Sequence, residues 1–203
     1  DLQENLELVN YEDIILDDAN SSVLLKKKGM KINLGAIAVG YAVDKAIDAL
    51  KNSGIENALI NAGGEIYALG SPPKKKLWRI GIQHPRRGGD LLGTIDLKDK
   101  AVSTSGDYEN YFEENGKRYS HIINARTGRP VEGVMSVTVV ADNTTDADAL
   151  STALMLMKPN EAMKLVERLN NVECLIVTGF DEKDMKILIS KGLEGKVNLI
   201  QTH

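Results

Sequence analysis

Apolar residues recur every three or four positions in three parts of the chain, and this spacing predicts helices. The first helix is expected over Ile37–Leu50, and Gly54 follows where a helix C-cap would lie. Two more are expected over Thr145–Met157 and Asn160–Leu169, the second after the break at Pro159. Strands are expected to outnumber these helices.

Short apolar or alternating runs predict strands in most of the remaining chain. Ala58–Ile60 and Ile66–Leu69 flank Gly63-Gly64, a pattern typical of a strand, a turn and a strand. Asn115-Gly116 is a strong hairpin signal between two further runs, and Val9–Leu16 is either a strand or a loop. The other expected strands are Ser21–Lys27, Met30–Asn33, Trp78–Gln83, Leu92–Leu97, Ala101–Thr104, Tyr111–Glu113, Arg118–Ile123, Met135–Ala141, Cys174–Thr178, Met185–Ile189 and Val197–Ile200. Because strands often come as neighbouring pairs, we expect an α+β fold with a largely antiparallel sheet.

Composition narrows the class of protein. A chain of 203 residues suits one domain, and 42% apolar with 27% charged residues is ordinary for a globular protein. The net charge of -4 argues against a nucleic-acid partner, which would need a basic surplus or patch. Cys174 is the single cysteine, so an internal disulfide is excluded, and the longest apolar runs are too short to span a bilayer.

The stretch Lys31–Gly70 is punctuated by glycines and predicts a ligand platform. A short strand, a helix and a second strand are joined by glycine-rich turns, which leave backbone amides open to a ligand that carries phosphates. Gly35 and Gly40 have a spacing that resembles half of a phosphate loop, but no Lys-Ser or Lys-Thr follows. A phosphate site and a plain tight turn both remain open.

Asp148 and Thr152 stand four residues apart on a predicted helix, so their side chains project from one face. Hard oxygen ligands of this kind suit Mg²⁺ or Ca²⁺, and magnesium commonly completes its shell with water and phosphate oxygens. A structural alternative is that Thr145 and Asp148 form a capping box at the start of the helix. On these residues alone, the cap is the stronger interpretation.

Two further segments are candidates for a ligand site. Val102–Tyr108 ends a strand in small hydroxyl residues and a glycine, which lets backbone amides approach a phosphate or a flat ring, or forms a simple turn. His121 follows a hairpin and precedes a turn, where it can serve as an acid/base group or be structural.

Four segments, in this order and spacing, resemble the ApbE family of FAD:protein FMN transferases. They are INLGAIAVGYAVD (Ile32–Asp44), LINAGGEIYALG (Leu59–Gly70), VSTSGDYENYFEENGKRYSHIINARTGRPV (Val102–Val131) and SVTVVADNTTDADALSTALMLM (Ser136–Met157). The resemblance covers nearly the whole chain from about Ser21, and four ordered motifs are far more specific than any single one. It implies an ApbE-like core and favours the metal-site interpretation of Asp148 over the cap.

The resemblance also implies a metal site and a flavin site. Asp148, Ser151 and Thr152 would bind Mg²⁺ together with the backbone carbonyl of Ala36, and His121 would be catalytic with Asp148. The residues expected to contact or shape the pocket for FAD are Asn33, Val39, Tyr41, Asp44, Gly63, Gly64, Thr104, Ser105, Gly106, His121 and Ile122.

The implied reaction splits FAD at its pyrophosphate and transfers FMN to a threonine hydroxyl of an acceptor protein, releasing AMP. The acceptor is expected to be an electron-transport subunit with a threonine flavinylation motif. Relatives commonly act outside the cytoplasmic membrane, often as lipoproteins, so the same location is expected here, with any membrane association through an anchor that precedes this segment. The family carries over a hundred further residues at the front, so we expect residues 1–203 to be a single ApbE-like domain truncated at its N-terminus.

Some residues depart from the family pattern. The family usually has Asp, Gly and Lys where this chain has Asn33, Ala36 and Val39, and Asp-Pro where it has Asn124-Ala125. Val39 removes a cation that could meet a phosphate. Two alternatives therefore accompany the transferase hypothesis: an FAD pyrophosphatase that gives FMN and AMP, and a flavin-binding relative without catalysis.

Overall fold

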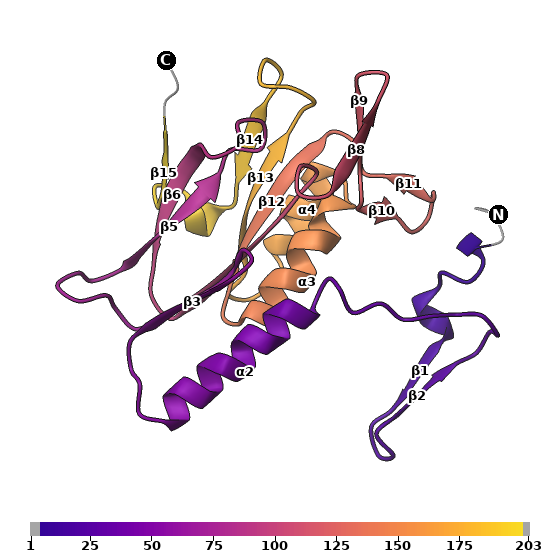
Figure 1. The fold of residues 1–203 in the computed structure, drawn as a ribbon, viewed down its shortest axis with the longest axis horizontal. Coiled ribbons are helices and arrows are strands. Elements are labelled where there is room, and N and C mark those ends of the chain that lie inside the picture. Colours follow the sequence, from indigo (N-terminus) through magenta and orange to yellow (C-terminus); the bar gives the residue numbers. More distant parts are fainter. Residues whose placement is uncertain (1–4, 201–203) are drawn as a thin grey trace.

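The computed structural model describes residues 5–200, and its centre is a six-stranded antiparallel sheet (Figure 1). The strands lie in the order β14-β13-β12-β7-β4-β3, and every neighbouring pair is antiparallel. Their bounds are β3 Ala58–Ala62, β4 Glu65–Leu69, β7 Lys100–Gly106, β12 Val134–Ala141, β13 Glu173–Thr178 and β14 Lys186–Ile189. The expected α+β class with a largely antiparallel sheet is confirmed.

Helices cover one face of this sheet and a smaller sheet covers the other. The helices are α2 Ala38–Asn52, α3 Thr144–Met155 and α4 Pro159–Val166, and the smaller sheet has the order β15-β6-β5, with β5 Trp78–Gln83, β6 Leu91–Leu97 and β15 Val197–Leu199. β12 is buried along its whole length because both of its faces are covered. Val137 and Val139 pack toward the helices, whereas Met135 and Val140 pack toward the smaller sheet.

Three two-stranded hairpins and two short 3-10 helices complete the described chain. They are β1 Ile14–Asp17 with β2 Ser22–Leu25, β8 Tyr111–Glu114 with β9 Lys117–Ser120, β10 Ile123–Asn124 with β11 Arg129–Pro130, and the 3-10 helices Tyr11–Asp13 and Lys191–Leu193. Figure 1 shows β1 and β2 standing away from the three layers. Asn115 and Gly116 both have positive φ in the β8–β9 turn, as the Asn-Gly hairpin signal predicts. Within residues 5–200, no helix has the length and apolar character needed to cross a membrane.

Three local predictions were wrong. Met30–Asn33 forms no strand, because the Asn33 side chain accepts the N–H of Gly35 at 2.7 Å and turns the chain. The predicted strand Arg118–Ile123 is divided after Ser120: the Ile122 N–H donates to the Ser120 side chain at 3.2 Å, and Ile123 pairs with Pro130 of a separate hairpin.

The third wrong prediction is the capping box of Thr145 and Asp148. Asn143 is the N-cap of α3, and its side chain accepts the N–H of Asp146. Asp148 lies one turn further on and caps nothing in its own helix. The remaining predicted helices and strands are confirmed with shifts of a few residues at their ends, which is the usual uncertainty of element boundaries.

Candidate functional site

The N-terminal turns of α2 and α3 meet, and each helix caps the other. Asp44 of α2 accepts the backbone N–H groups of Thr144 and Thr145 at 2.7 and 2.8 Å, at the start of α3. Asp148 of α3 accepts the N–H of Gly40 at 2.9 Å, in the first turn of α2. First-turn N–H groups have no partner inside their own helix, so these long-range contacts satisfy both ends and fix the angle between the helices.

Gly40 is what permits the two helices to come this close. A Cβ atom at this position would lie 2.4 Å from the carbonyl oxygen of Thr144 and 2.8 Å from the Cβ of Asp148. Real Cβ atoms do not make such contacts, so only glycine fits here. The glycine spacing in the sequence therefore marks a helix contact in addition to a turn.

Asp148 is a buried carboxylate, with only 6% of its surface exposed. Burial raises its pKa, and the hydrogen bond from the Gly40 N–H opposes that shift. No Lys, Arg or His of residues 5–200 forms an ion pair with it. A desolvated carboxylate with no cationic partner is the environment that a bound cation would stabilise.

Serine and threonine hydroxyls of α3 and the facing strand β7 form a cluster within one turn of Asp148 along α3. Ser151 is fully buried, and its Oγ lies 3.1 Å from Ser103 Oγ and 2.8 Å from Ser105 Oγ. Ser105 Oγ is also 3.0 Å from Thr152 Oγ1. Thus α3 and β7 bring the predicted residues Ser105, Ser151 and Thr152 together. Thr104 is separated from them, because alternate residues of a strand face opposite sides, and it pairs with Thr138 at 2.8 Å.

These residues fit a magnesium ion by the chemistry of their donors. Asp148, Ser151 and Thr152 offer only oxygen atoms, which Mg²⁺ prefers. The first helical hydrogen bond of α2 runs from the Tyr41 N–H to the Ile37 carbonyl, so the carbonyl of Ala36 lies just outside the helix ladder. Residues 5–200 contain no group of three or more His, Cys, Asp or Glu side chains suited to a metal. Besides the Asp148 carboxylate, a cation here would therefore rely on hydroxyl and carbonyl oxygens and on oxygen atoms of a bound phosphate compound or water.

His121 is exposed and is oriented by the backbone. Its Nδ1 lies 3.0 Å from the carbonyl oxygen of Asn110, and its own N–H donates to the same oxygen at 2.9 Å. Because a carbonyl can only accept, Nδ1 carries the proton in the neutral ring and Nε2 has a free lone pair. This is the tautomer that a general base requires at Nε2.

Glu65 is a candidate residue that the sequence interpretation missed. Its pKa is raised to about 7 in total. Burial is the largest cause, a hydrogen bond with Ser103 opposes it, and the charges of Asp148 and Glu109 add to it. Its Oε2 atom is buried with no hydrogen-bond partner within residues 5–200. A charged residue directly after Gly63-Gly64, at the start of a largely buried strand, was the available signal.

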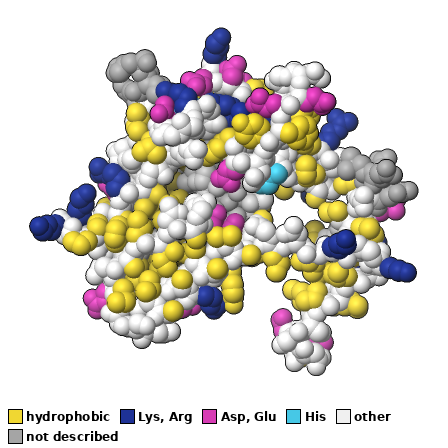
Figure 2. All heavy atoms as spheres, in the orientation of Figure 1, with side chains coloured by type: hydrophobic (Ala, Val, Ile, Leu, Met, Phe, Trp, Pro, Cys, Tyr) yellow, Lys and Arg dark blue, Asp and Glu magenta, His cyan; other side chains and the backbone are white. Residues whose placement is uncertain are grey.

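Glu109 extends this group of acids toward His121. Burial raises the pKa of Glu109, and the nearby charge of His121 lowers it. Figure 2 shows acidic side chains and a histidine near the middle of one face of the molecule. A cleft of about 730 Å³ opens on the side of the sheet where Thr104 lies; its lining includes Gly63, Gly64, Thr104, Tyr108 and Glu109.

The other predicted flavin residues are divided between surface and core. Asn33, Val39 and Tyr41 are exposed near the start of α2, where a ligand could reach them. Ile122 is buried in the core on the helix side of the sheet. The Cβ position of Gly106 is filled by the Tyr108 ring, whose Cε1 would be 2.4 Å away. Gly106 therefore leaves room for Tyr108, which lines the cleft, whereas Ile122 belongs to the core on the helix side of the sheet.

Comparisons with known proteins identify the family of this chain. The ApbE family model matches residues 1–176. The FAD:protein FMN transferase of Klebsiella pneumoniae (strain 342) is 34% identical over 192 residues, which are 94% of this chain and 58% of that protein. The corresponding protein of Treponema pallidum is also 34% identical over 192 residues, or 90% and 52% of the two chains.

Solved structures give the same result. The ApbE protein of Thermotoga maritima superimposes with a TM-score of 0.85 and 38% identity over 96% of this chain and 62% of that one. The flavin transferase ApbE of Vibrio cholerae gives 0.84 and 31%, over 96% and 61%. The chain spans about three fifths of the length of these proteins. The matching family model, the sequence relatives and the fold together show that this chain is a member of the ApbE family.

Proposed function

We propose that the protein transfers FMN from FAD to a threonine hydroxyl of an acceptor protein, in a magnesium-dependent reaction that releases AMP. The observation that carries this proposal is the junction of α2 and α3. It holds a buried carboxylate, Asp148, next to the hydroxyls of Ser105, Ser151 and Thr152 and beneath the first turn of a helix. This arrangement suits a cation that shares its shell with phosphate oxygens.

Asp148 and Thr152 would hold the ion, with Ser151 and the Ala36 carbonyl as further oxygen ligands. When bound, Mg²⁺ supplies positive charge that polarises the pyrophosphate and stabilises the leaving AMP. The protein's own contribution is to fix the ligand atoms. The Gly40 N–H holds one carboxylate oxygen of Asp148, and the Ser105 hydroxyl lies between those of Ser151 and Thr152. The Ala38 N–H already donates to the Leu34 carbonyl at 2.9 Å, so the contribution of α2 to an anion at this end would come mainly from its helix dipole.

His121 would accept the proton of the attacking threonine at Nε2. The new bond joins the threonine oxygen to the phosphorus of the FMN moiety, and the bond between that phosphorus and the bridging oxygen breaks. The Asn110 carbonyl keeps the His121 proton on Nδ1, so that Nε2 is free to act. Its exposure leaves room for an acceptor segment to approach.

The proposed acceptor and location rest on the family resemblance. We propose an electron-transport protein with a threonine flavinylation motif as acceptor, outside the cytoplasmic membrane. Support for both comes from the resemblance to ApbE proteins. The exposed position of His121 is compatible with a protein substrate, because a folded acceptor must reach the reacting phosphate with a single side chain.

The test is to incubate the chain with FAD, Mg²⁺ and an acceptor of known competence, and to measure FMN addition by mass spectrometry and AMP by chromatography. Asp148→Asn keeps an acceptor for the Gly40 N–H but removes the charge, so we expect at least a hundredfold loss of transfer. Asp146→Asn is the matched control, since Asp146 is exposed two residues away in the same helix.

Transfer by the wild type and by Asp146→Asn, with loss in Asp148→Asn, would support the proposal. AMP formation without FMN on the acceptor would replace the transferase with an FAD pyrophosphatase. FAD binding without either product would identify a flavin-binding relative.

A further inference from the structure

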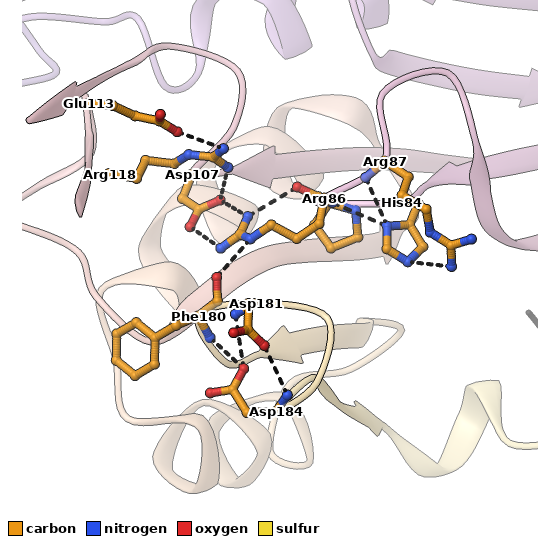
Figure 3. A network of polar contacts seen from close by, with 10 residues as sticks. His84, Arg86, Arg87, Asp107, Glu113, Arg118, Phe180, Asp181 and Asp184 are labelled. Atoms are coloured by element: carbon orange, nitrogen blue, oxygen red, sulfur yellow. Dashed lines mark hydrogen bonds and ion pairs between the residues drawn. The ribbon is translucent and has the colours of Figure 1, made fainter. Parts of the chain in front are cut away.

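Arg86 forms a largely buried ion pair with Asp107 through both arms of its guanidinium group (Figure 3). Its Nη1 and Nη2 atoms lie 2.6 and 2.8 Å from the two carboxylate oxygens of Asp107, and the side chains are only 12% and 14% exposed. Bidentate pairs of this kind fix both position and orientation, because the guanidinium fork and the carboxylate are planar. Asp107 immediately follows β7, the strand that carries Ser103 and Ser105.

Arg86 is itself held firmly. Its Nε donates to the carbonyl of Phe180 and its Nη1 to the carbonyl of Pro85, both at 3.0 Å. On the other side of Asp107, the Arg118 guanidinium lies 3.8 Å away and also donates to Glu113 at 3.2 Å. Figure 3 shows both arginines directed at the same carboxylate. Asp107 is therefore fixed between Arg86 of the loop after β5 and Arg118 of β9, and the loop after β13 holds Arg86 in place.

The loop from Asp107 to Asn110 transmits this position to His121. The N–H of Asp107 donates to the Met135 carbonyl at 2.9 Å, and the Tyr108 ring packs against Gly106. Three residues after Asp107, the carbonyl of Asn110 accepts both the N–H and the Nδ1–H of His121. The atom that selects the His121 tautomer is thus a backbone oxygen where this loop enters the β8–β9 hairpin, so its location depends on what fixes the loop as well as on the hairpin.

We propose that Arg86 is a positioning residue for His121: through Asp107, it holds the Asn110 carbonyl where it keeps the His121 proton on Nδ1. The link to catalysis rests on the proposed function, but the effect on the His121 ring does not. Replacing arginine with lysine keeps the charge and loses the two-armed geometry, so the loop would gain freedom without a buried unpaired carboxylate.

Arg79 offers a matched control in the same region of the fold. It forms a bidentate pair with Asp96, at 2.8 Å for both contacts, between β5 and β6. This pair has the same chemistry as Arg86–Asp107, but its arginine is 65% exposed and neither residue belongs to the loop that holds His121. A general effect of losing an arginine–carboxylate pair would appear in both variants.

The experiment measures the ¹⁵N chemical shifts of the His121 ring in the full 203-residue chain. In the wild type and in Arg79→Met, we expect one tautomer with the proton on Nδ1. In Arg86→Lys, we expect shifts averaged between two tautomers, with thermal unfolding still cooperative. The double variant Arg86→Met/Asp107→Asn removes both charges, leaves no unpaired buried carboxylate, and should give the same averaging if Arg86→Lys does not fold.

Kinetics provide the second readout once FMN transfer is established. Arg86→Lys should lower kcat about tenfold to a hundredfold with little change in KM for FAD, as expected when a catalytic group is displaced and substrate binding is retained. Arg79→Met should stay within about twofold of the wild type.

An unchanged single His121 tautomer in Arg86→Lys and in the double variant would overturn the inference, as would equal tautomer averaging in Arg79→Met. Absence of transfer in the wild type would contradict the proposed function alone, since the ring shifts are read without substrate.

Discussion

The α2–α3 junction and the loop Asp107–Asn110 with His121, called here the histidine loop, hold the two ends of the candidate site in different ways. At the junction, Asp44 and Asp148 make contacts between residues a hundred or more positions apart, and Gly40 is packed against backbone. In the histidine loop, His121 is exposed and depends on one carbonyl and on the ion pair behind it. A substitution at the junction is therefore expected to change stability and site geometry together. A substitution in the loop can change the site geometry and leave stability almost unchanged.

The largest effect on stability is expected from Gly40→Ala. The added Cβ would lie 2.4 Å from the Thr144 carbonyl oxygen, so the two helices must move apart and weaken both reciprocal caps. We expect a loss of about 3 kcal/mol in the free energy of unfolding, measured with urea. Gly88→Ala is the control, because a Cβ there meets nothing within 4 Å, and it should change stability by less than about 0.5 kcal/mol. Equal effects of the two substitutions would refute the close packing of the junction.

Asp44→Ala should have the next largest effect. It removes the acceptor of the Thr144 and Thr145 N–H groups, which leaves the start of α3 without that cap. The expected loss is about 2 kcal/mol, typical of a charged N-terminal acceptor. Asp48, one turn later in α2, makes only a distant 3.8 Å contact with Lys45, so Asp48→Ala should be nearly neutral. Chemical denaturation of the two variants side by side measures the difference.

Glu65→Gln should change stability in a pH-dependent way. The folded-state pKa of Glu65 is about 7 against an ordinary value of 4.5, so the folded protein retains a proton that the unfolded chain has lost. Wild-type stability from this group therefore falls as the pH rises from about 4.5 to about 7, and the glutamine variant escapes that loss. After allowance for solvent screening, we expect the variant to be more stable than the wild type by about 1 kcal/mol at pH 8 and equal at pH 4.

Unfolding measured in a chelator at both pH values tests this prediction. A chelator is needed because a bound cation would stabilise the ionised carboxylates nearby. A stability difference that does not vary with pH would show that Glu65 is not strained by burial.

The smallest effect on stability is expected in the histidine loop. His121→Asn loses the hydrogen bond to Asn110 on an exposed surface, so the free energy of unfolding should change by less than about 0.5 kcal/mol. The same substitution should abolish FMN transfer if His121 is the base. A stability loss as large as that of Asp44→Ala would mean that the two regions do not differ as described.

Sequence patterns predicted the elements of the fold well and the contacts between them poorly. Helical spacing and turn residues located α2, α3 and most strands, because those signals are local. The strand expected at Met30–Asn33 is absent, since its apolar residues have no neighbouring strand and Asn33 turns the chain. Spacing placed Asp148 and Thr152 on one helix face, but the bond from Asp148 to Gly40 joins residues 108 apart and has no local signature.

The family resemblance supplied what spacing could not, with limits of its own. It changed the interpretation of Asp148 from a cap of its own helix to a metal ligand. The structure shows that Asp148 does cap a helix, but the helix is α2. It did not indicate Glu65, whose pKa depends on burial next to Ser103, Asp148 and Glu109. Nor did it indicate Arg86, because its role arises from a loop that approaches Asp107 only in the folded chain.

The most direct test of the account is a calorimetric titration of Mg²⁺ into the protein in the presence of FAD. The central claim is that the buried carboxylate at the α2–α3 junction binds the cation. We predict that the wild type and Asp146→Asn bind Mg²⁺ with the same affinity and that Asp148→Asn binds at least tenfold more weakly. Equal Mg²⁺ affinity in Asp148→Asn and the wild type would contradict the claim.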